Sequence, residues 1–110
     1  MKIDDSMQEK INFIQISEQN LHQLLSQKQT FQSQMMEVEG SLLEISKTKK
    51  TYKIIGNIMV EMDPEKLKID LDSKKEMLDL RLKSIQKQEE RIKQKIAETQ
   101  KEVMDAMKKK

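Results

Sequence analysis

Two long segments of the chain carry apolar residues at alternating spacings of three and four, which is the heptad pattern of a coiled coil. The first segment has apolar positions at Ile3, Met7, Ile14, Leu21, Leu24, Phe31, Met35, Val38, Leu42 and Ile45, interrupted at Lys10, Ser17 and Lys28. The second has Leu71, Leu78, Leu82, Ile85, Ile92, Ile96, Val103 and Ala106, interrupted at Lys75, Glu89 and Thr99. The pattern predicts two long helices, over about residues 5–46 and about 64–108, each with one narrow apolar stripe.

Composition supports an elongated helical molecule over a compact one. Charged residues make up 36% of the 110-residue chain, and aromatic residues only 3%. A coiled coil tolerates this balance because it buries a narrow stripe and leaves the remaining surface charged. The start of the second helix is also marked, since Asp63 is a good N-cap residue and Pro64 suits the first turn of a helix.

Between the two heptad segments lies Ile54-Ile55-Gly56-Asn57-Ile58-Met59-Val60, which predicts a β-hairpin within about residues 51–62. Gly56 supplies the positive φ that a two-residue type II′ turn needs at its first central position. An isolated hairpin is marginally stable, and both of its edges are open. We therefore expect it to pair with strands of other chains, through an assembly hairpin formed by Tyr52, Ile54, Ile55, Gly56, Asn57, Ile58, Met59 and Val60.

The two heptad segments agree in register if the chain folds back about the Gly56-Asn57 turn, because residues whose numbers sum to 113 then lie opposite one another. Leu42 meets Leu71, and Phe31 meets Leu82. This favours an intramolecular antiparallel hairpin over a parallel dimer, so we expect one mainly α domain over residues 1–110. Each interruption then pairs a polar residue with an apolar one, such as Lys28 with Ile85. Three such layers fall consecutively near the free ends, which predicts a weakened seam there.

Several function classes are disfavoured. The chain lacks cysteine, its amino terminus does not read as a signal peptide, and no run approaches the roughly 20 apolar residues of a membrane span, so we expect a soluble, cytoplasmic protein. The net charge is only +2 with the signs interspersed, which argues against nucleic acid and membrane partners. The basic cluster of Lys47, Lys49, Lys50 and Lys53 is interpreted as a solvated or partner-facing surface.

No residue pattern indicates catalysis. His22 is the single histidine and should point to solvent, whereas a metal site needs several converging ligands. Acidic pairs such as Glu89-Glu90 have no predicted pocket that would shift their pKa values. We therefore expect no enzyme activity, no catalytic or metal-binding residues and no cofactor.

Apolar residues outside the seam gather at both ends of the predicted hairpin and are sparse in its middle. Such a distribution suggests one apolar end for assembly and another for binding a further protein. The second group, which we call the tip residues, lies where the seam is interrupted. It comprises the off-seam residues Ile11, Phe13, Ile16, Met104 and Met107, together with the seam residues Met7, Ile14 and Val103 at the same end.

The sequence resembles a β-class prefoldin subunit of the archaeal type over nearly its whole length. The resemblance depends on "QKQTFQSQM" in the first helix, "TYKIIGNIMVEMDPEK" in the hairpin, and "SIQKQEERIKQKIAETQKEVMDAM" in the second helix. An α-class subunit would need two hairpins, and this chain has room for one. The connection "SKTKKTYK" departs from the family by being shorter and more basic.

The resemblance implies a hexamer of two α-class and four β-class subunits, whose hairpins join into β-barrels. It also implies an ATP-independent chaperone, in which the tip residues hold unfolded polypeptides for delivery to a group II chaperonin. A different kind of function also fits the pattern. The chain would then be a coiled-coil tether or adaptor that docks through its hairpin and has no chaperone activity.

Overall fold

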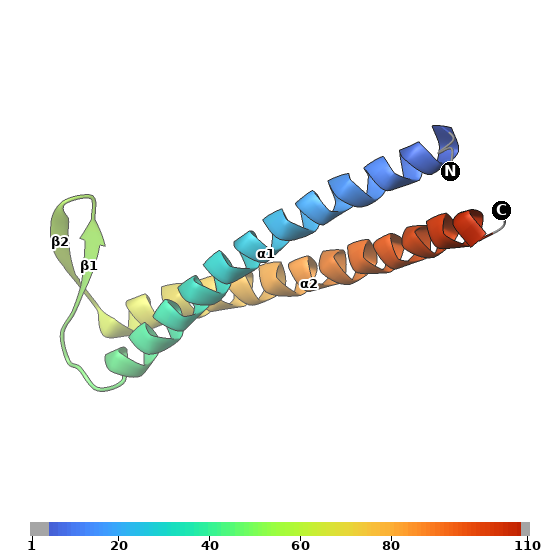
Figure 1. Cartoon of the computed structure of the whole chain (residues 1–110). Coiled ribbons are helices and arrows are strands. Elements are labelled where there is room, and N and C mark those ends of the chain that lie inside the picture. Colours follow the sequence, from blue (N-terminus) through green and yellow to red (C-terminus); the bar gives the residue numbers. More distant parts are fainter. Residues whose placement is uncertain (1–4, 109–110) are drawn as a thin grey trace. The chain divides into compact units, whose positions relative to one another are not determined.

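The computed structural model describes residues 5–108, so the predicted seam position Ile3 lies outside the described residues. Its elements in chain order are α1 (Asp5–Ile45), β1 (Thr51–Ile55), β2 (Ile58–Met62) and α2 (Pro64–Lys108), shown in Figure 1. The chain is thus mainly α, with two long antiparallel helices and one short β-hairpin between them, as the heptad pattern predicted. It divides into two compact units, which we describe separately.

Unit 1 pairs the first part of α1, up to Lys28, with the last part of α2, from Ser84 onward. Its buried apolar residues are Met7, Ile85 and Ile96, all of which are predicted seam positions. Two predictions for this unit are wrong. Ala106 is exposed, although its spacing placed it in the seam, and Ile11 is half-buried, although its spacing placed it outside.

Unit 2 runs from Gln29 to Lys83 and contains the end of α1, the hairpin and the start of α2. Val38 and Leu78 are its most buried apolar side chains, with Leu78 only 2% exposed. Lys75, predicted to interrupt the seam opposite Val38, is exposed instead, and its Nζ lies 3.9 Å from Glu39 Oε1. The Arg81 guanidinium lies 5.6 Å from the centre of the Phe31 ring, one position from the predicted partner Leu82.

Two predicted interruptions of the seam contact each other in unit 1. The Nζ of Lys28 lies 3.4 Å from Glu89 Oε2, and Glu89 is 7% exposed. We expected Lys28 to face Ile85 and Glu89 to face Leu24, so that each polar residue met an apolar one. The register did not anticipate that these two long side chains also reach across one heptad layer to each other, where their ion pair offsets part of the desolvation of the Glu89 carboxylate.

The ends of the helices next to the hairpin are capped by side chains. The hydroxyl of Ser46 donates to the carbonyl oxygen of Leu43 at 2.6 Å, and that of Thr48 donates to the carbonyl oxygen of Glu44 at 3.3 Å. The last carbonyl groups of a helix lack intrahelical partners, and these bonds help to satisfy them; the Glu44 carbonyl oxygen also accepts from the backbone N–H of Lys47 at 3.0 Å. At the start of α2, Asp63 Oδ1 accepts a hydrogen bond from the backbone N–H of Glu65 at 3.3 Å, as expected for an N-cap residue.

Candidate functional site

The hairpin has the turn and the register that the sequence predicted. Its strand partners run from Thr51 opposite Met62 to Ile55 opposite Ile58, so their residue numbers sum to 113 throughout. Gly56 has a φ of 60° and is the only residue among those described with a positive φ. A positive φ at the first central residue and not at Asn57 is the signature of a type II′ turn, whose twist matches that of the flanking strands.

The base of the hairpin is tied together by a side chain that sequence reasoning missed. Thr51 is buried, and its hydroxyl donates to the carbonyl oxygen of Met62 at 2.7 Å. The bond joins the first residue of β1 to the last residue of β2. A threonine opening a strand was the available signal, but threonine also suits strands generally and does not by itself indicate this bond.

Most of the predicted assembly hairpin is exposed. Its apolar side chains are between 41% and 70% exposed, and they comprise Tyr52, Ile54, Ile55, Ile58, Met59 and Val60. Among the described residues the sheet has only these two strands, so the outer edge of each presents unpaired backbone N–H and C=O groups. Figure 1 shows that, in unit 2, the hairpin projects beyond the adjoining ends of α1 and α2.

An open groove of about 930 Å³ adjoins the hairpin within unit 2. The hairpin contributes Tyr52, Ile54 and Met59 to its lining, and the helices contribute Gly40, Leu43 and Leu67 among others. Sequence reasoning placed apolar residues outside the seam at this end of the molecule but did not predict a groove. The segment 46–50, which connects α1 to β1, contributes Thr48 and Lys50 to its lining.

The structure places the tip residues in unit 1 and divides them into two sets. Met7 is buried, and Ile11, Ile14 and Val103 are half-buried. The others are between 41% and 57% exposed, and they are Phe13, Ile16, Met104 and Met107. Phe13 and Ile16 are three residues apart on α1, as are Met104 and Met107 on α2, so each pair occupies one face of its helix.

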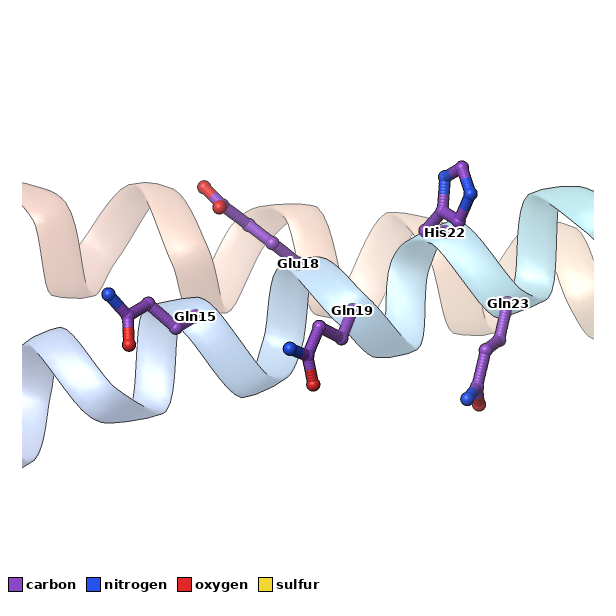
Figure 2. Close-up of a pocket in the computed structure, with 5 residues that line it drawn as sticks. All are labelled: Gln15, Glu18, Gln19, His22 and Gln23. Atoms are coloured by element: carbon purple, nitrogen blue, oxygen red, sulfur yellow. The ribbon is translucent and has the colours of Figure 1, made fainter.

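The polar surface of α1 around His22 offers no constellation for chemistry. Figure 2 shows that Gln15, Glu18, Gln19, His22 and Gln23, which line a shallow depression on this helix, do not converge on a common point. His22 is exposed. Over residues 5–108, no group of three or more histidine, cysteine, aspartate or glutamate side chains is placed to hold a metal ion.

The four lysines of the basic cluster are all exposed, in agreement with a solvated or partner-facing surface. They are Lys47, Lys49, Lys50 and Lys53. As for membranes, neither helix, within its described residues, contains a stretch long and apolar enough to cross a bilayer.

Comparison with known proteins adds to this geometry. The family model described as "Prefoldin subunit" matches residues 8–110, which is almost the whole chain. The chain belongs to the prefoldin subunit family. Prefoldin subunit beta of Sulfurisphaera tokodaii is 32% identical over 109 residues, covering 96% of this chain and 87% of the relative. Prefoldin subunit beta of Archaeoglobus fulgidus is 28% identical, with 96% and 94% covered.

A solved structure agrees with the class as well as the family. The crystal structure of the prefoldin beta subunit from Thermococcus strain KS-1 matches with a TM-score of 0.88 at 26% identity, covering 96% of this chain and 95% of the other. The resemblance to a β-class prefoldin subunit of archaeal type is thereby confirmed. In this prefoldin subunit, exposed apolar side chains lie on the hairpin of unit 2, at four of the tip residues of unit 1, and at further helix positions such as Leu25 and Met36.

Proposed function

We propose that this prefoldin subunit is part of an ATP-independent chaperone that holds non-native polypeptides by apolar contact and passes them to a group II chaperonin. The observation that carries the proposal is the exposed set Phe13, Ile16, Met104 and Met107, which no other part of the described chain covers. Exposed apolar groups of this kind on a stable helical surface indicate a binding site for another protein.

The residue types suit a client of variable sequence. Methionine is unbranched and polarizable, so Met104 and Met107 can adapt to apolar groups of different shape. Phe13 supplies a large flat apolar surface beside Ile16. The contact that one chain offers is small, and we therefore propose that several chains act together, through the high effective concentration that a shared assembly gives.

Assembly is proposed to occur with other prefoldin subunits, in a hexamer of two α-class and four β-class chains, through the assembly hairpin. Ile54, Ile55, Ile58 and Met59 expose apolar surface on both faces of the hairpin. Strands of neighbouring subunits would cover that surface and pair with the open edges.

Holding a client at the tip residues needs no nucleotide, because apolar contact is reversible.

The proposal is tested by replacing the four exposed tip residues with serine, in a chain assembled with an α-class subunit. Dilution of a chemically denatured test protein into the complex, followed by light scattering without ATP, should show aggregation suppressed by the unchanged complex and not by the variant. The matched control replaces Ile69, Met36, Met77 and Leu80 of unit 2, which are also exposed helix residues. This control should still suppress aggregation.

The tether or adaptor reading predicts a different result. A tether binds one folded partner, so neither the unchanged complex nor the tip variant would suppress the aggregation of a denatured protein. Delivery is tested separately, by adding a group II chaperonin with ATP to a complex that already holds the client. Recovery of native client should require the chaperonin, and a complex that releases native client alone would contradict the delivery step.

A further inference from the structure

Two of the exposed tip residues are methionines. Met104 is 56% exposed and Met107 is 45% exposed, and their spacing of three residues places both on one face of α2. With Phe13 and Ile16 they make up the exposed part of the tip residues, so thioethers supply half of its large apolar side chains. The chain contains no cysteine, and all of its sulfur therefore lies in methionine.

Among residues 5–108, the other methionines are either covered or part of unit 2. Three of them are exposed, and they are Met36, Met59 and Met77. Met35 and Met62, also in unit 2, are half-buried, and Met7 of unit 1 is 7% exposed. Within the described part of unit 1, the accessible thioethers are therefore those of Met104 and Met107, and both belong to the surface proposed to hold clients.

An exposed thioether reacts with peroxides. The sulfur lone pair attacks one oxygen of hydrogen peroxide, so that an S–O bond forms while the O–O bond breaks. Sulfur loses two electrons, and the departing hydroxide takes the proton of the transferred hydroxyl and leaves as water. The product is a sulfoxide, which is polar and chiral where the thioether was apolar and flexible. The oxidant must reach the sulfur, so exposed methionines react before buried ones.

We infer that Met104 and Met107 form an oxidation site, at which a peroxide converts the client-binding surface to a form that binds more weakly. This inference rests on the proposed function, and adds how that function is regulated. A sulfoxide oxygen buried against an apolar client loses its hydrogen bonds to water and gains none, which opposes binding. Because weak contacts of several chains act together, a loss in each chain is multiplied across the assembly.

Oxidation at this site should leave the fold and the assembly intact. Met104 and Met107 lie outside the heptad seam, whose buried residues in unit 1 include Met7 and Ile96. The hydrogen bonds of a helix join backbone groups and do not involve the thioether. The assembly hairpin belongs to unit 2, and neighbouring strands would cover its methionine, Met59, in the proposed assembly. The site therefore changes client binding separately from folding and assembly.

Two variants separate the tip methionines from the others. The tip variant carries Met104→Leu and Met107→Leu, and the body variant carries Met36→Leu, Met59→Leu and Met77→Leu. Leucine resembles methionine in volume and in apolar character, but it has no sulfur to oxidise. Each chain is assembled with an α-class subunit, and each complex is treated with hydrogen peroxide and compared with its own untreated sample.

Peptide mass spectrometry of the treated complexes locates the oxygen atoms that were added. In the unchanged chain, Met104 and Met107 should be oxidised faster than Met7, since Met7 is buried. The body variant should show the same rates at these three positions. Its tip methionines are then the exposed thioethers that remain in the described part of the chain, so any effect of oxidation on this variant is assigned to them.

Light scattering of a denatured test protein, without ATP, measures client holding. Oxidation of the unchanged chain or the body variant should raise, on the order of tenfold, the concentration of complex that halves the scattering. Oxidation of the tip variant should not change that concentration. The α-class subunit is the same in every complex, so its own methionines do not explain a difference. Reduction with methionine sulfoxide reductases for both epimers should restore the unchanged complex.

Four results overturn the inference: tip methionines that stay reduced while Met7 is oxidised, a tip variant that loses as much client holding as the unchanged chain, an oxidised unchanged complex that holds clients normally, or no recovery after reduction. Circular dichroism and sedimentation velocity supply a fifth, because loss of helix or of assembly on oxidation would show that the effect comes from the fold.

The untreated samples separate this inference from the proposed function. An untreated unchanged complex that does not suppress aggregation contradicts the proposed function, and the regulation of that function with it. An untreated complex that suppresses aggregation, and still does so after Met104 and Met107 are oxidised, contradicts only the inference.

Discussion

The two units are equal in length, but their exposed apolar residues differ in kind. Among the described residues, six of the eleven large exposed apolar side chains of unit 2 lie on two paired strands whose edges also present free backbone groups. All five of unit 1 lie on helices whose backbone groups are already bonded. A strand edge binds through directional hydrogen bonds and so specifies its partner's geometry. A helix face offers apolar contact alone, which tolerates many partners. The difference suggests one surface for a fixed neighbour and one for a variable client.

The helical seams of the two units also differ. The buried residues of the unit 2 seam are apolar, namely Val38 and Leu78, whereas unit 1 buries Ser17 and Glu89 among its apolar residues. Burying a polar group gains less free energy than burying an apolar one of similar size, because its desolvation must be offset. The seam of unit 1 is therefore expected to be the less stable of the two.

The largest expected effect comes from breaking the hairpin surface of unit 2. Ile58→Lys places a charge in the surface that neighbouring strands would cover, so assembly should be lost while helical content stays high. Sedimentation velocity and circular dichroism measure the two quantities. Ile69→Lys is the matched control, since Ile69 is on α2 of the same unit and, like Ile58, is 65% exposed. An oligomer that persists in Ile58→Lys would mean that the hairpin is not the assembly surface.

The two phenylalanines sharpen the comparison, because one belongs to each unit. Phe31 of unit 2 is half-buried in the seam and contacts Arg81, whereas Phe13 of unit 1 is 41% exposed. Phe31→Ala should lower the free energy of unfolding by about 2–3 kcal/mol, less than the 3–5 kcal/mol typical of a fully buried phenylalanine. Phe13→Ala should lower it by less than about 0.5 kcal/mol, as is usual for exposed positions.

Client binding should respond in the opposite order. Phe13→Ala should weaken the suppression of aggregation, and Phe31→Ala should leave it unchanged at temperatures where the variant is folded. Denaturant unfolding at a fixed chain concentration, together with light scattering, gives both readings. Equal loss of stability in the two variants would show that the heptad assignment of Phe31 or of Phe13 is wrong.

Much of the fold followed from the sequence because its signals are local. The heptad spacing places nearly every half-buried or buried residue of both helices, and Gly56 with Asn57 determines the turn from which the strand register follows. Asp63 marks the start of α2 in the same way. These elements depend on residues close in the chain, where periodicity and capping are informative.

The candidate site was less predictable, because exposure depends on several side chains at once. Met7, which we included among the tip residues, is buried as its heptad position predicts, whereas Ile11, which spacing placed outside the seam, is half-buried. A heptad assignment considers each residue separately, so it does not capture how much of that residue the neighbouring side chains cover. The contact of Lys28 with Glu89 was missed for the same reason, since each residue was paired only with the one directly opposite.

That ion pair provides the smallest of the expected effects and tests the seam of unit 1. Lys28→Met leaves the buried Glu89 carboxylate without its partner, which should lower the free energy of unfolding by about 1–2 kcal/mol; this is less than for a fully buried pair, because the Lys28 side chain is 30% exposed. Glu89→Leu should cost less than about 0.5 kcal/mol, since the Lys28 ammonium can still reach water. Replacement of Lys28 should therefore lower the free energy of unfolding more than replacement of Glu89.

The double variant Lys28→Met with Glu89→Leu decides whether the ion pair stabilises the seam or only avoids a penalty. Replacement of both charges by apolar groups of similar size should restore or exceed the original free energy of unfolding, because no buried charge then remains to be desolvated. The exposed pair of Lys10 and Glu102 is the control, and Lys10→Met should cost less than about 0.5 kcal/mol. A double variant less stable than the unchanged chain would show that the ion pair is a net source of stability. The polar residue Glu89 would then strengthen the seam of unit 1, and the contrast in stability between the two units would fail.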